Sequence, residues 1–214
     1  MIHHTQDPAG GAWAAMLAES YGEDPGVRLQ FQGVADGQHI LELQCRGMLR
    51  GFAAVDGVTL QGELEGVALG YFTEDWEPLS QALATAQADL FSAVPPESLA
   101  RIGQNAAALN EIAQPDWFRP LLGPGNVYVL QAIAVRRDRR GTGVFRRLLT
   151  PILAQAEARK VPVVLQTFDL DNLRKYEHMG FVLQKELSSQ ALGVLSRIMR
   201  KLVCRLWLDE VSQQ

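Results

Sequence analysis

Apolar side chains recur along the chain with two different periods, which predict its helices and strands. A spacing of three or four residues is typical of a helix with one buried face, whereas alternation or a short continuous run is typical of a strand. In the first half, helical spacing covers residues 12–21, 38–49 and two segments between 78 and 114, separated by Pro95 and Pro96. Residues 58–60 and 64–72 predict a hairpin through Gly62-Glu63, and the turn-rich segments 22–37 and 116–125 predict irregular structure.

The second half of the chain alternates predicted strands and helices. Residues 127–135 predict a strand, 144 to about 160 a helix, 161–167 a strand, and 171–179 a short helix that Gly180 ends. Two strands are expected at 181–186 and 195–206, although the last segment also permits a helix. The strand at 127–135 is apolar on both faces except at Gln131, which indicates a central strand. Gln131 is then either hydrogen-bonded inside the core or directed into a cleft.

A glycine-rich turn follows that strand, with the sequence Arg140-Gly141-Thr142-Gly143-Val144-Phe145. Glycine lets the backbone bend tightly and approach a ligand closely. The first amides of the following helix have no partner within the helix, and the helix dipole adds positive potential there. Six arginines lie between positions 136 and 147 and only Asp138 opposes them, an excess of five charges in a chain of net charge −4. These features predict a ligand with several phosphates.

Three interpretations compete for this turn. An ordinary surface turn stays open, because glycine is common in loops. A Walker A loop is excluded, because Val144 and Phe145 stand where a Lys-Ser/Thr pair is required. A Rossmann turn would need a small residue where Arg146 stands, although Asp169 or Asp171 could supply the acidic residue of that fingerprint.

A second group of polar residues follows the strand at 161–167. Asn172 and Tyr176 are four positions apart, so they share one face of a helix, and Phe181 opens the next strand. An asparagine at a helix start is more often a cap than a ligand contact. A tyrosine near a helix end is more often a packing residue than a chemical group. Neither residue indicates a function without the glycine-rich turn.

The composition of the chain excludes several classes of protein but does not identify a single class. The chain has 214 residues, of which 47% are hydrophobic and 21% charged, as expected of a globular protein. Its mild acidity argues against general nucleic-acid binding, and no apolar run is long enough to cross a bilayer. Two cysteines without framework spacing, and His3 and His4 close to the start, predict neither a disulfide scaffold nor a metal site. A cytoplasmic protein is expected, because the first residues lack a leader pattern.

Taken together, the two polar groups resemble the GCN5-related N-acetyltransferase (GNAT) family. The resemblance is specific over residues 127–186 and looser over 64–72, and one position departs from it, since Phe145 stands where the family usually has Gly or Ala. It implies an α/β fold with a mixed, mostly antiparallel sheet, two splayed parallel strands that form an acyl-CoA cleft, and helices on both faces. One domain is expected over 1–214, with a recognisable core at about 64–206 and a helical, variable acceptor side at 1–50.

The resemblance also implies a site for acetyl-CoA as cosubstrate, without a metal. Ile133, Ala134 and Val135 would pair through their backbone with the pantetheine amides. Asn172 would contact the pantetheine arm, and Tyr176 would place its hydroxyl near the sulfur. The pyrophosphate would be held by the turn, with backbone amides from five residues and Arg140 nearby: Gly141, Thr142, Gly143, Val144 and Phe145.

The implied reaction moves an acetyl group to a primary amine of a small molecule or peptide. An ammonium group must first lose its proton, and the departing thiolate benefits from a proton donor, for which Tyr176 is the candidate. No base is visible, because Gln131 cannot act as one; Glu65, Asp169 or a chain of waters stay open, and His178 is disfavoured. The alternative is a non-catalytic acyl-CoA-binding module of the same fold. Neither nucleic acid nor membrane is an expected partner, and a homodimer is compatible with the resemblance.

Overall fold

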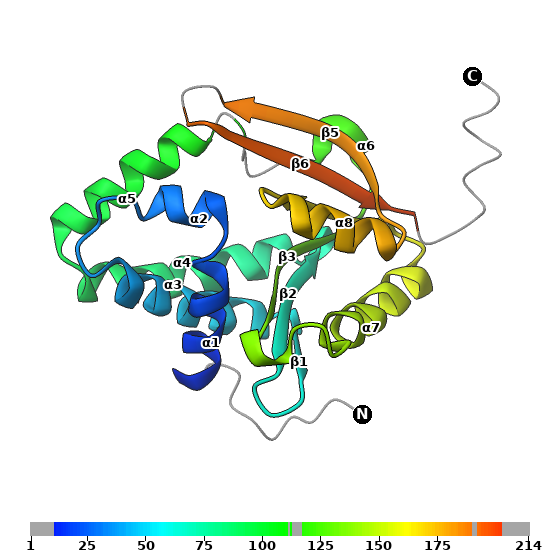
Figure 1. The fold of residues 1–214 in the computed structure, drawn as a ribbon, viewed down its shortest axis with the longest axis horizontal. Helices are drawn as coiled ribbons and strands as arrows, with labels where there is room; N and C mark the ends of the chain where they lie inside the picture. Colours follow the sequence, from blue (N-terminus) through cyan, green and yellow to red (C-terminus); the bar gives the residue numbers. More distant parts are fainter. Residues whose placement is uncertain (1–10, 111, 113–116, 190–191, 203–214) are drawn as a thin grey trace.

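The computed structural model describes residues 11–110, 112, 117–189 and 192–202. Within these ranges six strands form one mixed sheet in the order β1-β2-β3-β4-β6-β5 (Figure 1). Neighbouring strands are antiparallel except β3 and β4, which run parallel. The strands are β1 (Val58–Gln61), β2 (Gly66–Phe72), β3 (Tyr128–Val135), β4 (Val163–Thr167), β5 (Val182–Ser189) and β6 (Val194–Lys201). The expected mixed, mostly antiparallel fold is confirmed.

Helices occupy the segments between the strands. The helices before β3 are α1 (Gly11–Tyr21), α2 (Pro25–Gln30), α3 (Gly37–Ala53), α4 (Trp76–Ala93), α5 (Pro96–Leu109) and α6 (Arg119–Leu122). Those after it are α7 (Val144–Arg159) and α8 (Leu170–His178), and two single 3-10 turns are η1 (Thr73–Asp75) and η2 (Arg137–Arg139). None of the helices in the described part of the chain is long and apolar enough to cross a membrane.

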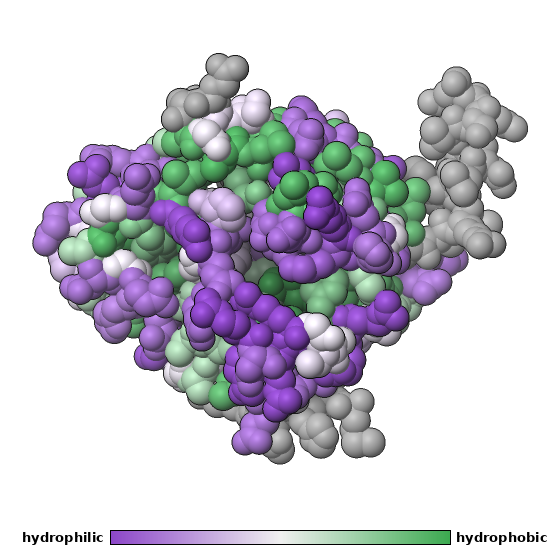
Figure 2. All heavy atoms as spheres, viewed as in Figure 1, coloured by the Kyte–Doolittle hydropathy of each residue, from purple (hydrophilic) through white to green (hydrophobic). Residues whose placement is uncertain are grey.

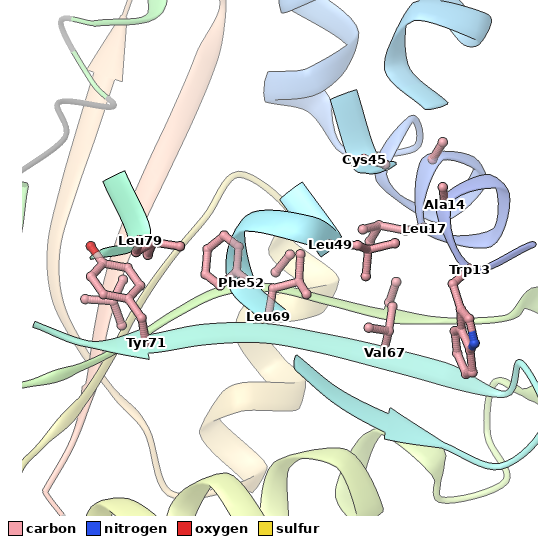
Figure 3. Close-up of a cluster of buried hydrophobic side chains, with 14 of the residues drawn as sticks. Trp13, Ala14, Leu17, Cys45, Leu49, Phe52, Val67, Leu69, Tyr71 and Leu79 are labelled. Carbon is pink, nitrogen blue, oxygen red and sulfur yellow. The ribbon is translucent and has the colours of Figure 1, made fainter. Parts of the chain in front are cut away.

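Two hydrophobic clusters lie on opposite faces of the sheet. The first joins α1, α3 and α4 to one face of β2 and β3, and Figure 3 shows Leu17, Leu49 and Leu69 converging in it. The second packs α7 and α8 against the other face, where Leu148 and Leu149 are fully buried. Burial of these side chains removes apolar surface from water and holds the helices to the sheet. The expected helices on both faces are therefore present.

An extra residue in β3 reverses the direction of its side chains. Leu69 of β2 pairs with Ala132 and Gly70 with Leu130, so Gln131 is left without a partner in β2. Before this bulge Val129 belongs to the first cluster, whereas after it Ala132 belongs there. A bulge of this kind re-aims side chains and is common beside active sites. Gln131 is exposed and lines a cavity, as a residue directed into a cleft should, and its side chain also forms a hydrogen bond with Tyr21.

The parallel strands β3 and β4 pair over only part of their length. Their register joins Tyr128, Val129 and Leu130 to Val163, Val164 and Leu165, and beyond these residues no pairing continues. The strand β6, not β3, accompanies β4 to its end at Thr167. The two parallel strands therefore separate in their carboxyl-terminal halves, as the resemblance to GNAT proteins implied.

Two features differ from the expectations drawn from the pattern of residues, and the last segment agrees with its expectation. The segment 22–37 contains α2, whose start is marked by Asp24 as N-cap and Pro25 in the first turn, and its six residues are too few to show a period. The loop at 116–125 contains the single turn α6. The last segment is a strand, β6, as far as Lys201, and its expected continuation over 203–206 lies outside the described residues.

Candidate active site

A cavity of about 860 Å³ opens where β3 and β4 separate. Its wall includes Gln131, Ile133 and Val135 of β3 and Gln166 and Thr167 of β4. Figure 2 shows this face of the molecule hollowed near its centre, with hydrophilic residues around the opening and hydrophobic surface inside. The turn before α7, the helix α8 and the α1–α2 segment complete the wall. The cavity therefore brings together both polar groups recognised in the sequence.

The glycine-rich turn has the backbone conformation of an anion site. Gly141 and Gly143 have φ angles of 79° and 84°, values that residues with a side chain rarely adopt. A Cβ at Gly141 would meet no atom, so conformation rather than space requires glycine there. Gly143 is the N-cap of α7 and gives it no side-chain cap, which leaves the first amides of the helix free for a ligand. Gly141, Gly143, Val144 and Phe145 line the cavity.

Thr142 lies differently from its neighbours in the turn. It is not among the residues that line the cavity, and its amide is directed at the carbonyl of Arg139, 3.4 Å away. Its hydroxyl donates to the same carbonyl at 2.7 Å. The structure thus places four of the five expected pyrophosphate donors on the cavity wall and turns Thr142 back into the loop.

Two glutamates distant in sequence approach the arginines of the turn. Glu23, between α1 and α2, pairs with Arg137 at 2.5 Å and with Arg140 at 2.7 Å, and both guanidinium groups hold the pKa of Glu23 below its ordinary value. Glu65, before β2, lies 3.4 and 3.7 Å from two other arginines. With Asp138, three carboxylates pair with five of the six arginines. The local excess is therefore three positive charges, not five, and the correction comes from contacts that only the fold creates.

The edge of β3 presents alternate backbone groups to the cavity. The amide of Arg136 donates to Glu65 next to β2, and Ala134 pairs with Val67 of the same strand. Because backbone groups alternate in direction along a strand, Ile133 and Val135 turn theirs toward the cavity. The carbonyl of Val135 accepts a hydrogen bond from Arg140 Nε at 3.3 Å, in agreement with this direction. Of the three residues expected to meet pantetheine, Ala134 faces β2 and does not line the cavity.

The helix α8 contributes Asn172 and Tyr176 to the cavity wall. Asn172 lines the cavity, and its Oδ1 accepts a hydrogen bond from Lys175 at 2.9 Å. Tyr176 is only 6% exposed, and burial, together with the charge of Asp24, raises the pKa of its hydroxyl. Within the described part of the chain that hydroxyl has no hydrogen-bond partner. A buried, protonated and unpaired donor is therefore present on the cavity wall.

Comparison with solved structures places this arrangement in a known fold. A structure described as histone acetyltransferase HPA2 and related acetyltransferase, from Corynebacterium glutamicum, aligns with a TM-score of 0.57, 19% identity and 88% of each chain covered. The protein has the GNAT fold.

Two further acetyltransferases align over nearly the same extent. An N-acetyltransferase from Staphylococcus aureus Mu50 has a TM-score of 0.54 and 15% identity, with 88% of this chain and 93% of that chain covered. Arylalkylamine N-acetyltransferase 2 from Aedes aegypti has a TM-score of 0.53 and 13% identity, with 90% and 94% covered. No family model matches the chain, and no curated protein matches its sequence. The GNAT fold is thus identified by comparison of three-dimensional structures and not by overall sequence similarity.

Phe145, the departure from the usual GNAT pattern, packs against Tyr176. The two ring centroids are 5.5 Å apart with an interplanar angle of 62°, and Phe181 meets the other side of Tyr176 at the same distance. Edge-to-face contacts of this kind are favourable and fix the orientation of a ring. The side chain of Phe145 therefore leaves its own backbone amide free on the turn and holds Tyr176 in place.

The structure separates the candidates for a catalytic base. Glu65 does not line the cavity and is held by arginines of the turn. Asp169 does line it, as N-cap of α8, with Oδ1 accepting from the amide of Asp171 at 2.7 Å. His178, which the sequence disfavoured as a base, also lines the cavity, because the cavity extends along α8 as far as Met179.

The α1–α2 segment contributes residues that the sequence pattern did not single out. Tyr21 ends α1, and burial raises the pKa of its hydroxyl. Asp24 caps α2, and burial raises the pKa of its carboxyl, to which the charge of Asp169 adds. Both residues line the cavity. The Asp-Pro pair at 24–25 is a helix-start signal, but nothing in the sequence relates that helix to residues almost 150 positions later.

Proposed function

We propose that the protein is an acetyl-CoA-dependent N-acetyltransferase that moves an acetyl group to a primary amine of a small molecule or peptide. The observation that carries the proposal is the cavity between the separated ends of β3 and β4, whose wall contains both a phosphate-type turn and the unpaired Tyr176 hydroxyl. The GNAT fold of solved acetyltransferases supports it.

The proposed chemistry follows from the groups on the cavity wall. After the ammonium group loses one proton to solvent, the amine nitrogen attacks the acetyl carbonyl carbon, and a C–N bond forms as the C–S bond breaks. The amide of Ile133, directed to the cavity, is the donor for the developing oxyanion. Tyr176 gives its phenolic proton to the departing thiolate, and the second proton, which the nitrogen loses as it becomes an amide, finally replaces it.

A non-catalytic acyl-CoA-binding module is the second candidate. The observation that favours it is the enclosure of Tyr176 between Phe145 and Phe181, which is also what a purely structural tyrosine would have. Thiol release from acetyl-CoA, measured across polyamines, aminoglycosides, amino acids and peptides, separates the two functions. Release that depends on an added amine supports the enzyme.

Coenzyme A should stabilise the protein against unfolding. At about a hundred times its dissociation constant, a ligand that binds only the folded state adds about 2.7 kcal/mol. For a chain of this length, that gain corresponds to a rise in Tm of about 5–10 °C. Differential scanning fluorimetry with coenzyme A and with NAD measures it. No shift, or an equal shift with NAD, would remove the acyl-CoA site.

Reversal of charge at Arg140 should weaken coenzyme A binding by more than about tenfold, because Arg140→Glu places an anion beside the phosphates. The side chain is 43% exposed, so the fold should survive. Arg101→Glu on α5 is the matched control, since Arg101 is exposed and lies outside the cavity wall. Calorimetric titration of both variants gives the affinities. Equal affinities would mean that the phosphates bind elsewhere.

A further inference from the structure

Two carboxylates on the cavity wall, Asp24 and Asp169, take no part in the ion pairs of the arginine-rich turn. Asp24 Oδ1 accepts from the amides of Gly26 at 2.8 Å and Val27 at 3.2 Å, and Asp169 Oδ1 accepts from the first turn of α8. Among the described residues, neither Oδ2 atom has a hydrogen-bond or ion-pair partner. Each carboxylate is thus fixed through one oxygen and has the other available to a ligand.

The two carboxylates belong to segments that pack directly on each other. A Cβ added to Gly26 would come within 2.9 Å of the Phe168 ring, so the start of α2 rests on the residue before Asp169. The charge of Asp169 raises the pKa of Asp24, in addition to the larger effect of burial. The hydrogen bonds from the Val27 and Gly26 amides oppose this rise, and the charge of Arg28 opposes it least. A cation bound between the carboxylates would relieve their repulsion.

An independent feature of the same cavity also points to a ligand. Only 6% of the surface of Tyr176 is exposed, so the residue is 94% buried. It lines the cavity, and its hydroxyl has no hydrogen-bond partner among the described residues. The charge of Asp24 raises the pKa of both Tyr176 and Tyr21, so the three groups are close enough to interact electrostatically. An ammonium group has three N–H donors, and carboxylate and hydroxyl oxygens are suitable acceptors for them.

The remaining wall near α2 combines apolar side chains with neutral amides. Val27 follows Asp24 on the same helix, and Leu109 comes from α5, which is tied to α2 by hydrogen bonds from Asn105 to the carbonyls of residues 30 and 32. Met48 and Trp117 are further apolar residues of this lining, and Gln30 and Gln44 are its amides. The apolar side chains can contact a hydrophobic body, and neither amide carries a charge that would pair with a second ammonium group.

We propose that Asp24, together with Asp169, binds the ammonium group of the acceptor, and that the acceptor carries this group on an apolar body. The inference rests on the proposed function, which it extends to the class of amine. It assigns opposite charges to two groups of residues in one cavity: arginines for the phosphates of the cosubstrate and carboxylates for the acceptor.

Calorimetric titration of 2-phenylethylamine into the protein saturated with coenzyme A tests the proposal without any turnover. The amine should bind at least about tenfold more tightly than 2-phenylethanol, its neutral analogue, and than spermidine. Asp24→Asn should weaken amine binding at least about tenfold and leave coenzyme A affinity within about twofold. Asparagine caps helices as well as aspartate does, so this variant should fold normally.

Asp36→Asn is the matched control, because Asp36 also precedes a helix, α3, but is exposed and lies outside the cavity wall. Its amine affinity should equal that of the parent protein. Equal binding of amine and alcohol, tighter binding of spermidine, no amine binding, or full amine affinity in Asp24→Asn would overturn the proposal. Failure of coenzyme A to bind would instead contradict the proposed function, and the same titration of the free protein would still test the ammonium site.

Discussion

Replacement of Tyr176 by phenylalanine should lower the turnover number at least about tenfold, within the range of about 10²–10⁴ for a general acid. The apparent affinity for acetyl-CoA should change little, because the hydroxyl would act mainly in the transition state. The Phe145 and Phe181 contacts involve the ring and should persist in the variant. Steady-state kinetics, with an acceptor amine identified, measures both parameters.

The environment of Tyr176 explains why its hydroxyl suits this role. Burial raises its pKa above the ordinary value, so the group holds its proton throughout the neutral range and titrates only in strongly alkaline solution. Titration of Tyr176 should therefore not lower the turnover number as the pH rises through the neutral range. Its hydroxyl has no partner among the described residues, so the substitution should change the free energy of unfolding by less than about 1.5 kcal/mol.

Tyr128 provides the matched control for this experiment. It is also buried, its pKa is also raised by burial, and its ring packs on Phe72, but it lies outside the cavity wall. Tyr128→Phe should leave turnover unchanged. If Tyr176→Phe also has a normal turnover number while the chemical step limits the rate, Tyr176 only lines the cleft and does not act as a general acid. The non-catalytic acyl-CoA-binding module then becomes the better interpretation.

Truncation of Leu148 to alanine should destabilise the fold by about 2–5 kcal/mol, the usual cost of a cavity in a close-packed core. Leu148 is fully buried on the inner face of α7 and lies against Gly66 of β2, where a Cβ would come within 2.9 Å of its Cδ1. Glycine at 66 therefore leaves the space that this leucine fills. The loss would act on the helix whose first turn presents the anion site.

Urea denaturation followed by circular dichroism gives the change in the free energy of unfolding. Leu153→Ala, on the same helix but only partly buried, should cost about half as much or less. Coenzyme A affinity of Leu148→Ala, measured well below its Tm, should stay near that of the parent protein. A cost below about 1 kcal/mol would mean that α7 is not held to the sheet through this contact.

Much of the site could be predicted because its parts are local in sequence. The turn at 140–145 combines glycines, a preceding apolar run and a following apolar stripe within about thirty residues, and the structure has β3, the turn and α7 in that order. Asn172 and Tyr176 share a wall of the cavity because their spacing matches the helical period. Short-range steric and hydrogen-bonding preferences determine such features, so they are present in the sequence itself.

The bulge at Gln131 illustrates what a period cannot reveal. A continuous run of apolar residues has the same sequence pattern whether or not the strand contains a bulge. Only the pairing with β2 shows that Gln131 has no partner in that strand. The same pairing turns Ala134 away from the cavity and leaves Ile133 and Val135 facing it. Register depends on contacts between strands that are about sixty residues apart, and no local pattern contains it.

The sequence by itself therefore determined the strands and helices around the turn, the glycine-rich turn itself and the face of α8 that bears Asn172 and Tyr176, because each depends on neighbouring residues. Only the tertiary structure decided which charges meet. It brought Glu23 to Arg140 and Asp24 to Asp169, through contacts between segments more than a hundred residues apart. Long-range contacts of this kind result from the packing of the whole sheet and its helices, so the acceptor side of the cavity became visible only in the folded chain.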